Sequence, residues 1–336
     1  MAFSGRRSPV TARTVSAFVP RSSSPQGGAQ TAVGNSWTQR VVFIIGAPRS
    51  GTTLVYRMLV RNQPQISGSE QESRWFSRQI WEPYTLQRAL ENSYVQGLLE
   101  EEAIRSIYAR SRDWAEFFRE MVRHKLRSTT AAFFVEKTPA QTLCIRRIRR
   151  RIPECQFLVV WRQAGAVIHS MVVTPWIGLR VQRLPGSLWP RFLAYWEAAS
   201  IYCAYWWKIR ELWHRDARSV VLRYEDIVRQ KINLREFFRE WLGVELGELF
   251  ISRPFSAEVE HRHYELDESR CDAYCEHMPL WVRKVVEFTF PEPSVPARAV
   301  PAVARWILFG LPANALRLWE AIGRRRQRAG TRSPEN

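Results

Sequence analysis

The sequence predicts an α/β protein built in three layers, with helices on both faces of a central parallel sheet. Two observations support this fold class. Short apolar runs typical of buried parallel strands alternate with longer helical segments, and a glycine-bounded loop joins the first run to the next helix. Connections of this kind are right-handed crossovers. With 336 residues, 46% of them hydrophobic and 12% aromatic, the chain can bury a sizeable core.

Three strands and several helices are expected along the chain. The first strand is the continuous apolar run at residues 41–45, which stops at Gly46, and a helix should follow from about Thr53. Residues 100–126 are amphipathic and predict one or two helices. The remaining elements are a second strand at 157–161, a long aromatic helix at 189–213 and a third strand at 220–223.

The composition divides the chain into three parts. Residues 1–38 are rich in Ser, Pro, Gly and Arg without an apolar period, which predicts a disordered tail. Residues 39–291 form one predicted domain, and residues 292–336 a basic tail or amphipathic helix. Trp306, Leu311 and Leu318 precede a cluster of arginines there, a pattern that fits a helix lying on an anionic membrane as well as a solvated tail.

The charge and the cysteines narrow the classes of function. The net charge of +18 is carried by 45 Arg and only 5 Lys, and guanidinium groups pair well with phosphate and carboxylate. Anionic partners are therefore expected, although no recognition motif supports nucleic acid. The five cysteines contain no Cys-x-x-Cys pair, so we expect no metal site and a reduced, cytoplasmic protein. No apolar run is long enough for a membrane span, and residues 1–38 lack the apolar region of a signal peptide.

The most informative segment follows the first predicted strand. Gly46 and Gly51 have the Gly-x4-Gly spacing of a phosphate-binding loop between a strand and a helix. Backbone N–H groups and the positive helix end would hold an anion there. A nucleotide kinase of the Walker type needs Lys directly after the second Gly, and Thr52 occupies that position. A P-loop-like fold is therefore expected, and the absence of the Walker lysine disfavours a kinase as the function.

Residues 47–54, Ala-Pro-Arg-Ser-Gly-Thr-Thr-Leu, resemble the 5′-phosphosulfate loop of sulfotransferases that use 3′-phosphoadenosine-5′-phosphosulfate (PAPS), particularly the tyrosylprotein and the bacterial carbohydrate or small-molecule branches. The resemblance implies that PAPS is the sulfuryl donor. The cofactor-binding residues that it implies in this loop are Arg49, Ser50, Gly51, Thr52 and Thr53.

A second segment, residues 158–171, resembles the strand and helix that bind the 3′-phosphate in the same family. Arg162 and Ser170 occupy its two phosphate-binding positions, while Gln163 stands where the family usually has an acidic residue. The residues support this assignment independently, because Arg162 follows a buried strand and a guanidinium can donate two parallel hydrogen bonds to a phosphate.

Two shorter segments resemble the family as well. Lys137 lies in a Lys-x-Pro motif and would stabilise charge near the transferred sulfuryl group; a solvated surface lysine is the alternative. Tyr224 begins a Tyr-Glu-Asp motif and would lie against the adenine; a buried core tyrosine is the alternative.

The reaction also needs a base for the acceptor's proton. The resemblance implies a glutamate in the segment after the first helix, and counting from Pro64 favours Glu70 over Glu72. A histidine is the other arrangement known in the family, for which His124 and His169 are candidates. The predicted catalytic residues are thus Glu70, Lys137 and Arg49.

Two further sets of residues bear on the cover of the 3′-phosphate and on the acceptor. The resemblance covers about residues 41–243, and a basic loop over the 3′-phosphate has only Arg262, Arg270 and Arg283 as candidates beyond it. The aromatic residues that follow Glu72 would form either a platform for the acceptor or part of the core: Trp75, Phe76, Trp81 and Tyr84.

The predicted function is sulfuryl transfer from PAPS, without a metal, to a hydroxyl or amine of a small molecule, saccharide or peptide. A P-loop kinase and a non-catalytic anion-binding protein of the same fold are the alternatives. The predicted location is the cytoplasm, and the C-terminal tail is either a peripheral membrane contact or a solvated tail.

Overall fold

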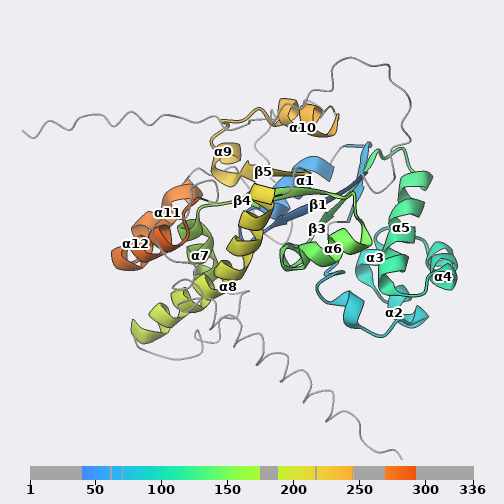
Figure 1. The fold of residues 1–336 in the computed structure, drawn as a ribbon, viewed down its shortest axis with the longest axis horizontal. Helices are drawn as coiled ribbons and strands as arrows, with labels where there is room; N and C mark the ends of the chain where they lie inside the picture. The colour runs from blue at the N-terminus through green and yellow to red at the C-terminus, as the bar shows by residue number, and fades with distance from the viewer. Residues whose placement is uncertain are drawn as a thin grey trace, which may run out of the picture. The chain divides into compact units, whose positions relative to one another are not determined.

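A parallel sheet lies at the centre of the protein (Figure 1). The computed structural model describes residues 40–60, 63–69, 71–174, 188–215, 218–243, 245 and 269–292. The predicted tails, residues 1–38 and 292–336, therefore lie almost wholly outside the described residues. The α/β fold class with a central parallel sheet flanked by helices is confirmed.

The sheet has five parallel strands in the order β2-β3-β1-β4-β5. Their bounds are β1 Val41–Gly46, β2 Ile66–Gly68, β3 Phe133–Lys137, β4 Gln156–Trp161 and β5 Ser219–Arg223. The three predicted strands are confirmed as β1, β4 and β5. The sequence analysis did not predict β2, which has only three residues, or β3, which ends in two charged residues.

Strand β1 occupies the middle of the sheet, and all six of its residues are buried. Successive side chains point to opposite faces of a strand. Phe43 and Ile45 accordingly pack in one apolar cluster, and Val42 and Ile44 in another. This is why the strand appears in the sequence as an uninterrupted apolar run.

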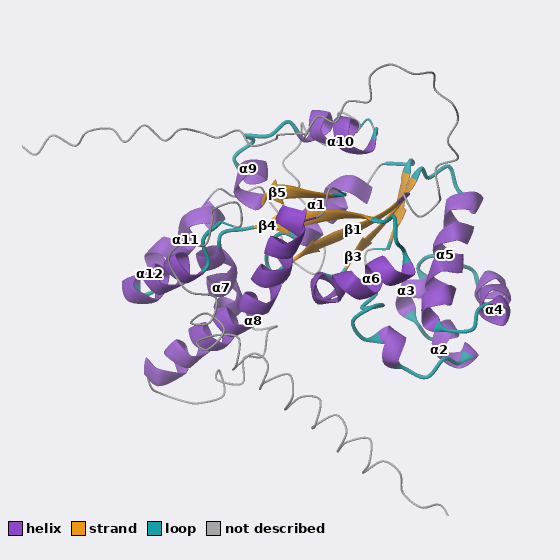
Figure 2. Ribbon diagram, viewed as in Figure 1, coloured by secondary structure: helices purple, strands orange, loops and turns teal. Residues whose placement is uncertain are grey.

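Helices cover both faces of the sheet (Figure 2). One face packs against helices that follow β1 and β5, and the other against helices from the segment between β2 and β4 together with part of the long helix α8. The bounds are α1 Thr52–Val60, η2 Gln79–Trp81, α2 Leu86–Leu90, α3 Ser93–Gln96, α4 Glu101–Arg110, α5 Trp114–Ser128, η3 Pro139–Cys144, α6 Ile145–Arg151, α7 Ala164–Val173, α8 Leu188–Arg215, α9 Tyr224–Val228, α10 Leu234–Leu242, α11 Ser269–His277 and α12 Leu280–Thr289.

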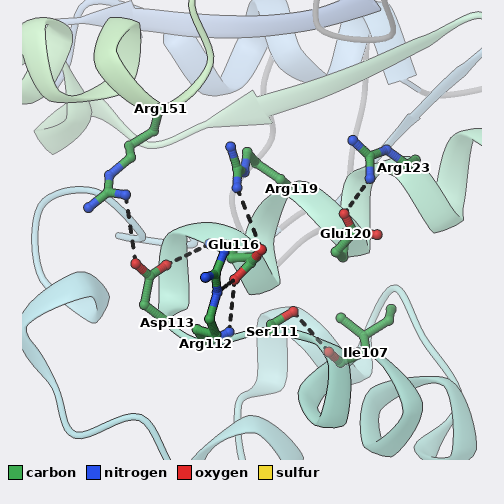
Figure 3. Close-up of polar contacts among 9 residues, drawn as sticks. All are labelled: Ile107, Ser111, Arg112, Asp113, Glu116, Arg119, Glu120, Arg123 and Arg151. Atoms are coloured by element: carbon green, nitrogen blue, oxygen red, sulfur yellow. Dashed lines mark hydrogen bonds and ion pairs between the residues drawn. The ribbon is translucent and has the colours of Figure 1, made fainter.

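The amphipathic segment predicted at residues 100–126 is two helices, α4 and α5 (Figure 3). Asp113 caps α5, because its carboxylate accepts the N–H of Glu116 at 2.8 Å. The Glu116 carboxylate in turn accepts the backbone N–H of Arg112 at 3.0 Å. The first bond satisfies a helix N–H group that has no partner within the helix, and the second holds the residue that precedes the cap. They define the start of α5, whose buried aromatic side chains pack against one face of the sheet.

Helices α7, α8, α11 and α12 share a third apolar cluster. In Figure 1, α11 and α12 lie beside α7, in agreement with their packing. Within the described part of the chain, no helix is both long and apolar enough to cross a membrane.

Candidate functional site

The predicted binding residues follow the carboxyl ends of four neighbouring strands. Gly46, Lys137, Trp161 and Arg223 are the last residues of β1, β3, β4 and β5. Ligands of parallel α/β sheets bind outside this edge. The sheet order therefore brings together segments that are up to about 180 residues apart in the sequence.

The anion loop, defined here as residues 47–51, turns sharply between β1 and α1. Arg49 has a φ of 71°, in the left-handed region that costs a non-glycine residue about 1–3 kcal/mol, and Gly51 has a φ of 95°. A Cβ on Gly51 would lie 2.3 Å from Cδ2 of Tyr224. Glycine is therefore required at position 51 by both its backbone conformation and its neighbour. Thr52 and Thr53 are the first two residues of α1, so their N–H groups belong to its positive end.

The segment that follows β3 holds the start of the anion loop. The Thr142 hydroxyl, which belongs to η3, accepts the N–H of Gly46 and donates to the carbonyl of Gly46, each at 2.9 Å. Thr142 is completely buried. The end of β1 is thus tied to the segment that carries the Lys-x-Pro motif.

Arg49, Arg162 and Ser170 are joined by direct hydrogen bonds. Arg162 donates from Nη1 to the carbonyl of Arg49 at 3.1 Å, and Arg49 donates from Nε to the hydroxyl of Ser170 at 3.2 Å. The structure therefore brings the residues predicted for the two ends of the nucleotide into one cluster. Two arginines in one hydrogen-bonded cluster are a setting that favours an anion.

Tyr224 contacts both the anion loop and this arginine cluster. Its ring lies against Gly51, and the guanidinium carbon of Arg162 lies 4.4 Å from its centroid. Tyr224 is 7% exposed and shares an apolar cluster with residues of α1, so it is a buried tyrosine. An adenine contact remains a prediction.

Glu225 is a site residue to which the sequence analysis assigned no role. Its carboxylate accepts the N–H of Gln163, the residue that caps α7, at 3.0 Å. Burial raises the pKa of Glu225, against the lowering effects of that N–H and of the Arg162 charge. Glu225 therefore supplies a buried carboxylate beside the backbone of Gln163.

Lys137 and Glu72 form an ion pair with 3.2 Å between Nζ and Oε1. The lysine side chain is only 4% exposed, whereas that of Glu72 is 31% exposed. The solvated-surface alternative for Lys137 is therefore wrong. The end of β3 and the base segment, residues 69–74, meet at this pair.

Next to Lys137, Glu136 is fully buried and accepts hydrogen bonds from the hydroxyls of Ser73 and Thr138, at 2.6 and 2.7 Å. Burial raises its pKa to about 7, although these hydrogen bonds and the Lys137 charge lower it. The sequence analysis assigned no role to Glu136. The only signal was an acidic residue inside an otherwise apolar Phe-Phe-Val run.

The other predicted candidates have different positions. Glu70 lies outside the described residues, as does Arg262. His169 is buried and its Nδ1 lies 2.9 Å from the hydroxyl of Tyr195, which agrees with a structural role. His124 is half-buried in α5. Arg283 donates to the carbonyl of Cys275 at 3.0 Å, and Arg270 lies in α11.

Two of the four aromatic candidates for an acceptor platform belong to the core. Trp75 and Phe76 are completely buried, and Trp75 donates from Nε1 to the carbonyl of Trp114 at 2.8 Å. Tyr84 stacks on Tyr108 with 4.6 Å between the ring centroids. Trp81 alone of the four is a large exposed aromatic residue.

The donor set at the strand ends is of a kind that suits anionic groups. It combines two arginines, one lysine, hydroxyl groups and the start of a helix, all of which donate hydrogen bonds to anions. Within the described residues, no group of three or more His, Cys, Asp or Glu could hold a metal ion. The turn between β1 and α1 is P-loop-like, and hydrogen-bond donors surround it.

The chain belongs to the sulfotransferase family, whose sequence model matches residues 41–248. The matched range contains the anion loop, Lys137, Arg162, Ser170 and Tyr224. No curated protein sequence matches the chain at a significant level. The family, and not a branch within it, is what the comparison identifies.

Two solved structures are similar in fold. The sulfotransferase domain of the Synechococcus PCC 7002 olefin synthase is 17% identical, with a TM-score of 0.51, over 81% of this chain and 94% of that domain. The sulfotransferase domain from the curacin biosynthetic pathway is also 17% identical, with a TM-score of 0.50, over 73% of this chain and 95% of that domain. Both likenesses agree with the parallel sheet and its flanking helices.

Proposed function

We propose that the protein transfers the sulfuryl group of PAPS to a hydroxyl or amine. The observation that carries this proposal is the direct link between Arg49, Arg162 and Ser170 at the carboxyl edge of the sheet. The sequence resemblance assigns these positions to the segments that hold the two ends of PAPS. A single cluster of donors would therefore bind one nucleotide at both its 5′ and its 3′ group.

Each proposed residue has a defined task in this reaction. PAPS supplies an activated sulfuryl group whose bond to the 5′-phosphate oxygen breaks as the acceptor's oxygen or nitrogen forms a bond to sulfur. Arg49 and Lys137 stabilise the negative charge on the transferred group and on the leaving phosphate. Ser50, Gly51, Thr52 and Thr53 hold the 5′-phosphate through the loop and the helix start. Arg162 and Ser170 hold the 3′-phosphate, and Tyr224 contacts the adenine.

Glu70 is the proposed base, which takes the proton from the acceptor as the new bond forms. The count from Pro64 supports it, and Glu72 is already engaged with Lys137. Glu72 is the second candidate, because its carboxylate is partly exposed beside that lysine. The two glutamates are two residues apart, so the experiment must compare them directly.

Cofactor binding separates the proposal from a kinase. A ligand that binds only the native state at about 100 times its Kd adds about 2.7 kcal/mol of stability. Adenosine 3′,5′-bisphosphate should therefore raise the Tm clearly, and ATP with Mg²⁺ much less. The reverse order would contradict the PAPS assignment.

Product analysis separates an enzyme from a non-catalytic protein of the same fold. The protein should be incubated with ³⁵S-labelled PAPS and separate fractions of small molecules, saccharides and peptides from a cell extract. Transfer of label to one fraction identifies the acceptor class. Nucleotide binding without transfer to any fraction would favour the non-catalytic alternative.

The C-terminal tail is proposed as a peripheral membrane contact. Residues 299–328 combine apolar and basic residues and lie outside the described residues. Sedimentation with anionic vesicles at low salt should require these residues, while PAPS binding should not. Failure of the full chain to sediment with vesicles at low salt would leave a solvated tail.

A further inference from the structure

Glu136 occupies a position in the sheet that normally holds an apolar side chain. It lies in β3 opposite Phe43 of the central strand β1, and it is completely buried. Burying a carboxylate is costly unless hydrogen bonds satisfy it, so a valine or leucine here would be the simpler way to fill a core. The carboxylate therefore calls for an explanation beyond packing.

One carboxylate oxygen of Glu136 accepts hydrogen bonds from the residues that follow Glu72 and Lys137, the two partners of the ion pair. Oε1 accepts from Ser73, which follows Glu72, and from Thr138, which follows Lys137. The two hydroxyls thus converge on a single acceptor from the two segments that carry the paired charges.

Further hydrogen bonds tie the same two segments together. Gln141 donates from Nε2 to the hydroxyl of Ser73 at 2.8 Å, and the N–H of Arg74 lies 3.3 Å from the hydroxyl of Thr138. Ser73, Thr138 and Gln141 are all buried. Side-chain networks that exclude water in this way hold their members in one geometry.

We propose that Glu136 is a positioning residue, which fixes Lys137 and the base segment relative to each other through Ser73 and Thr138. Together these side chains form the Glu136 network: Glu136, Ser73, Thr138 and Gln141. The catalytic consequence rests on the proposed function, because it assumes that Lys137 and the base segment act on the transferred group. The positioning itself does not.

Lys137 provides a readout that does not depend on activity. The chain has only five lysines, so the rate at which each is acetylated by N-hydroxysuccinimidyl acetate can be followed peptide by peptide. Burial and the Glu72 ion pair should make Lys137 slow to react. Loss of a buried hydrogen bond next to it should speed its acetylation about tenfold, which corresponds to about 1.4 kcal/mol. Lys208 and Lys284 serve as internal references.

The variants separate the hydroxyl contacts from charge and from general destabilisation. Thr138→Val and Ser73→Ala remove a hydroxyl without changing charge, and both should speed Lys137 acetylation. Thr138→Ser keeps the hydroxyl and should behave like the wild type. Phe134→Leu, in the same buried strand but outside the Glu136 network, should leave the Lys137 rate unchanged. Glu136→Gln should also speed Lys137 acetylation if the variant folds. If it does not fold, Thr138→Val and Ser73→Ala alone test the proposal.

Two results would overturn the proposal: wild-type Lys137 rates in both folded hydroxyl variants, or an equal acceleration in Phe134→Leu. Binding of adenosine 3′,5′-bisphosphate is measured on the same proteins. If the wild type fails to bind it, the proposed function fails while the labelling result stands. If the wild type binds and transfers label, Ser73→Ala should lower kcat about tenfold with little change in the Kd for the bisphosphate.

Discussion

Lys137 Nζ lies 3.2 Å from Oε1 of Glu72, so a buried cation at the end of β3 is neutralised by a carboxylate of the base segment. An ammonium group that donates to a carboxylate can exchange that partner for another anion in the same place. We therefore expect Lys137 to leave Glu72 for the transferred group when the nucleotide binds. We therefore expect substitutions of Glu70 and Glu72 to have different effects on turnover.

Glu70→Gln should reduce turnover by about 10²- to 10⁴-fold, the usual contribution of a general base, because an amide cannot accept the acceptor's proton. Binding of adenosine 3′,5′-bisphosphate should remain near the wild-type value. The measurement is single-turnover transfer of ³⁵S to the acceptor identified by labelling.

Glu72→Gln is the matched control for Glu70→Gln. It removes the ionic partner of Lys137 but leaves Glu70 in place, so its effect on turnover should be much smaller. If the two effects are exchanged, Glu72 is the base. If neither variant slows transfer, the carboxylate mechanism is wrong, and His124 is the next candidate because His169 is bonded to Tyr195.

Arg162→Ala should weaken binding of adenosine 3′,5′-bisphosphate by about 1.5–3 kcal/mol, the value of a hydrogen bond to a charged group. Affinity for adenosine 5′-phosphate, which lacks the 3′-group, should change little. Calorimetric titration with both ligands provides the test. Since Arg162 also donates to the carbonyl of Arg49, equal losses for both ligands would mean that it mainly supports the anion loop.

Gly51→Ala should lower the free energy of unfolding by at least about 1–3 kcal/mol, because a φ of 95° strains any residue with a Cβ. The added Cβ would also meet the Tyr224 ring at 2.3 Å. Urea denaturation of Gly51→Ala, Tyr224→Ala and the double variant separates the two causes. The glycine substitution should cost less in the Tyr224→Ala background; an equal cost in both would exclude the ring as a cause.

The stability of the protein should depend on pH through Glu136. Burial raises the pKa of its carboxyl to about 7 in the folded state, so between about pH 4.5 and 7 the folded state binds more protons than the unfolded state. The stabilisation is therefore fully present below pH 4.5 and is lost as the pH rises through 7, by on the order of 3 kcal/mol.

Urea denaturation of the wild type and Glu136→Gln at pH 5 and pH 8 tests this slope. The stability advantage of the wild type over the variant should be larger at pH 5. Among the described residues, Lys137, Glu72 and Tyr94 interact electrostatically with Glu136, and they are unchanged in both proteins. A difference in stability that does not vary with pH would show that Glu136 does not titrate in this range.

The strands that the sequence predicts are those whose apolar runs are continuous. Strand β1 is buried on both faces, and so its pattern is unambiguous. Strand β3 was not predicted because Glu136 and Lys137 occupy two of its five positions, and their burial depends on partners from the base segment. The anion loop and Arg162 could be found from local motifs. The link between Glu136 and Ser73 could not, because 63 residues separate them and only the folded sheet brings them together.

The central place of β1 also affects how the molecule is assembled during synthesis. Strand β1, the first strand within the described residues, pairs with β3 and β4, which follow about 90 and 115 residues later, so the chain must close long loops before β1 is covered. The anion loop is made early, yet Tyr224, which packs against Gly51, arrives only with β5. A nascent chain thus holds the loop sequence long before it holds all residues of the proposed site, and the proposed nucleotide would stabilise the protein only after most of the domain has left the ribosome.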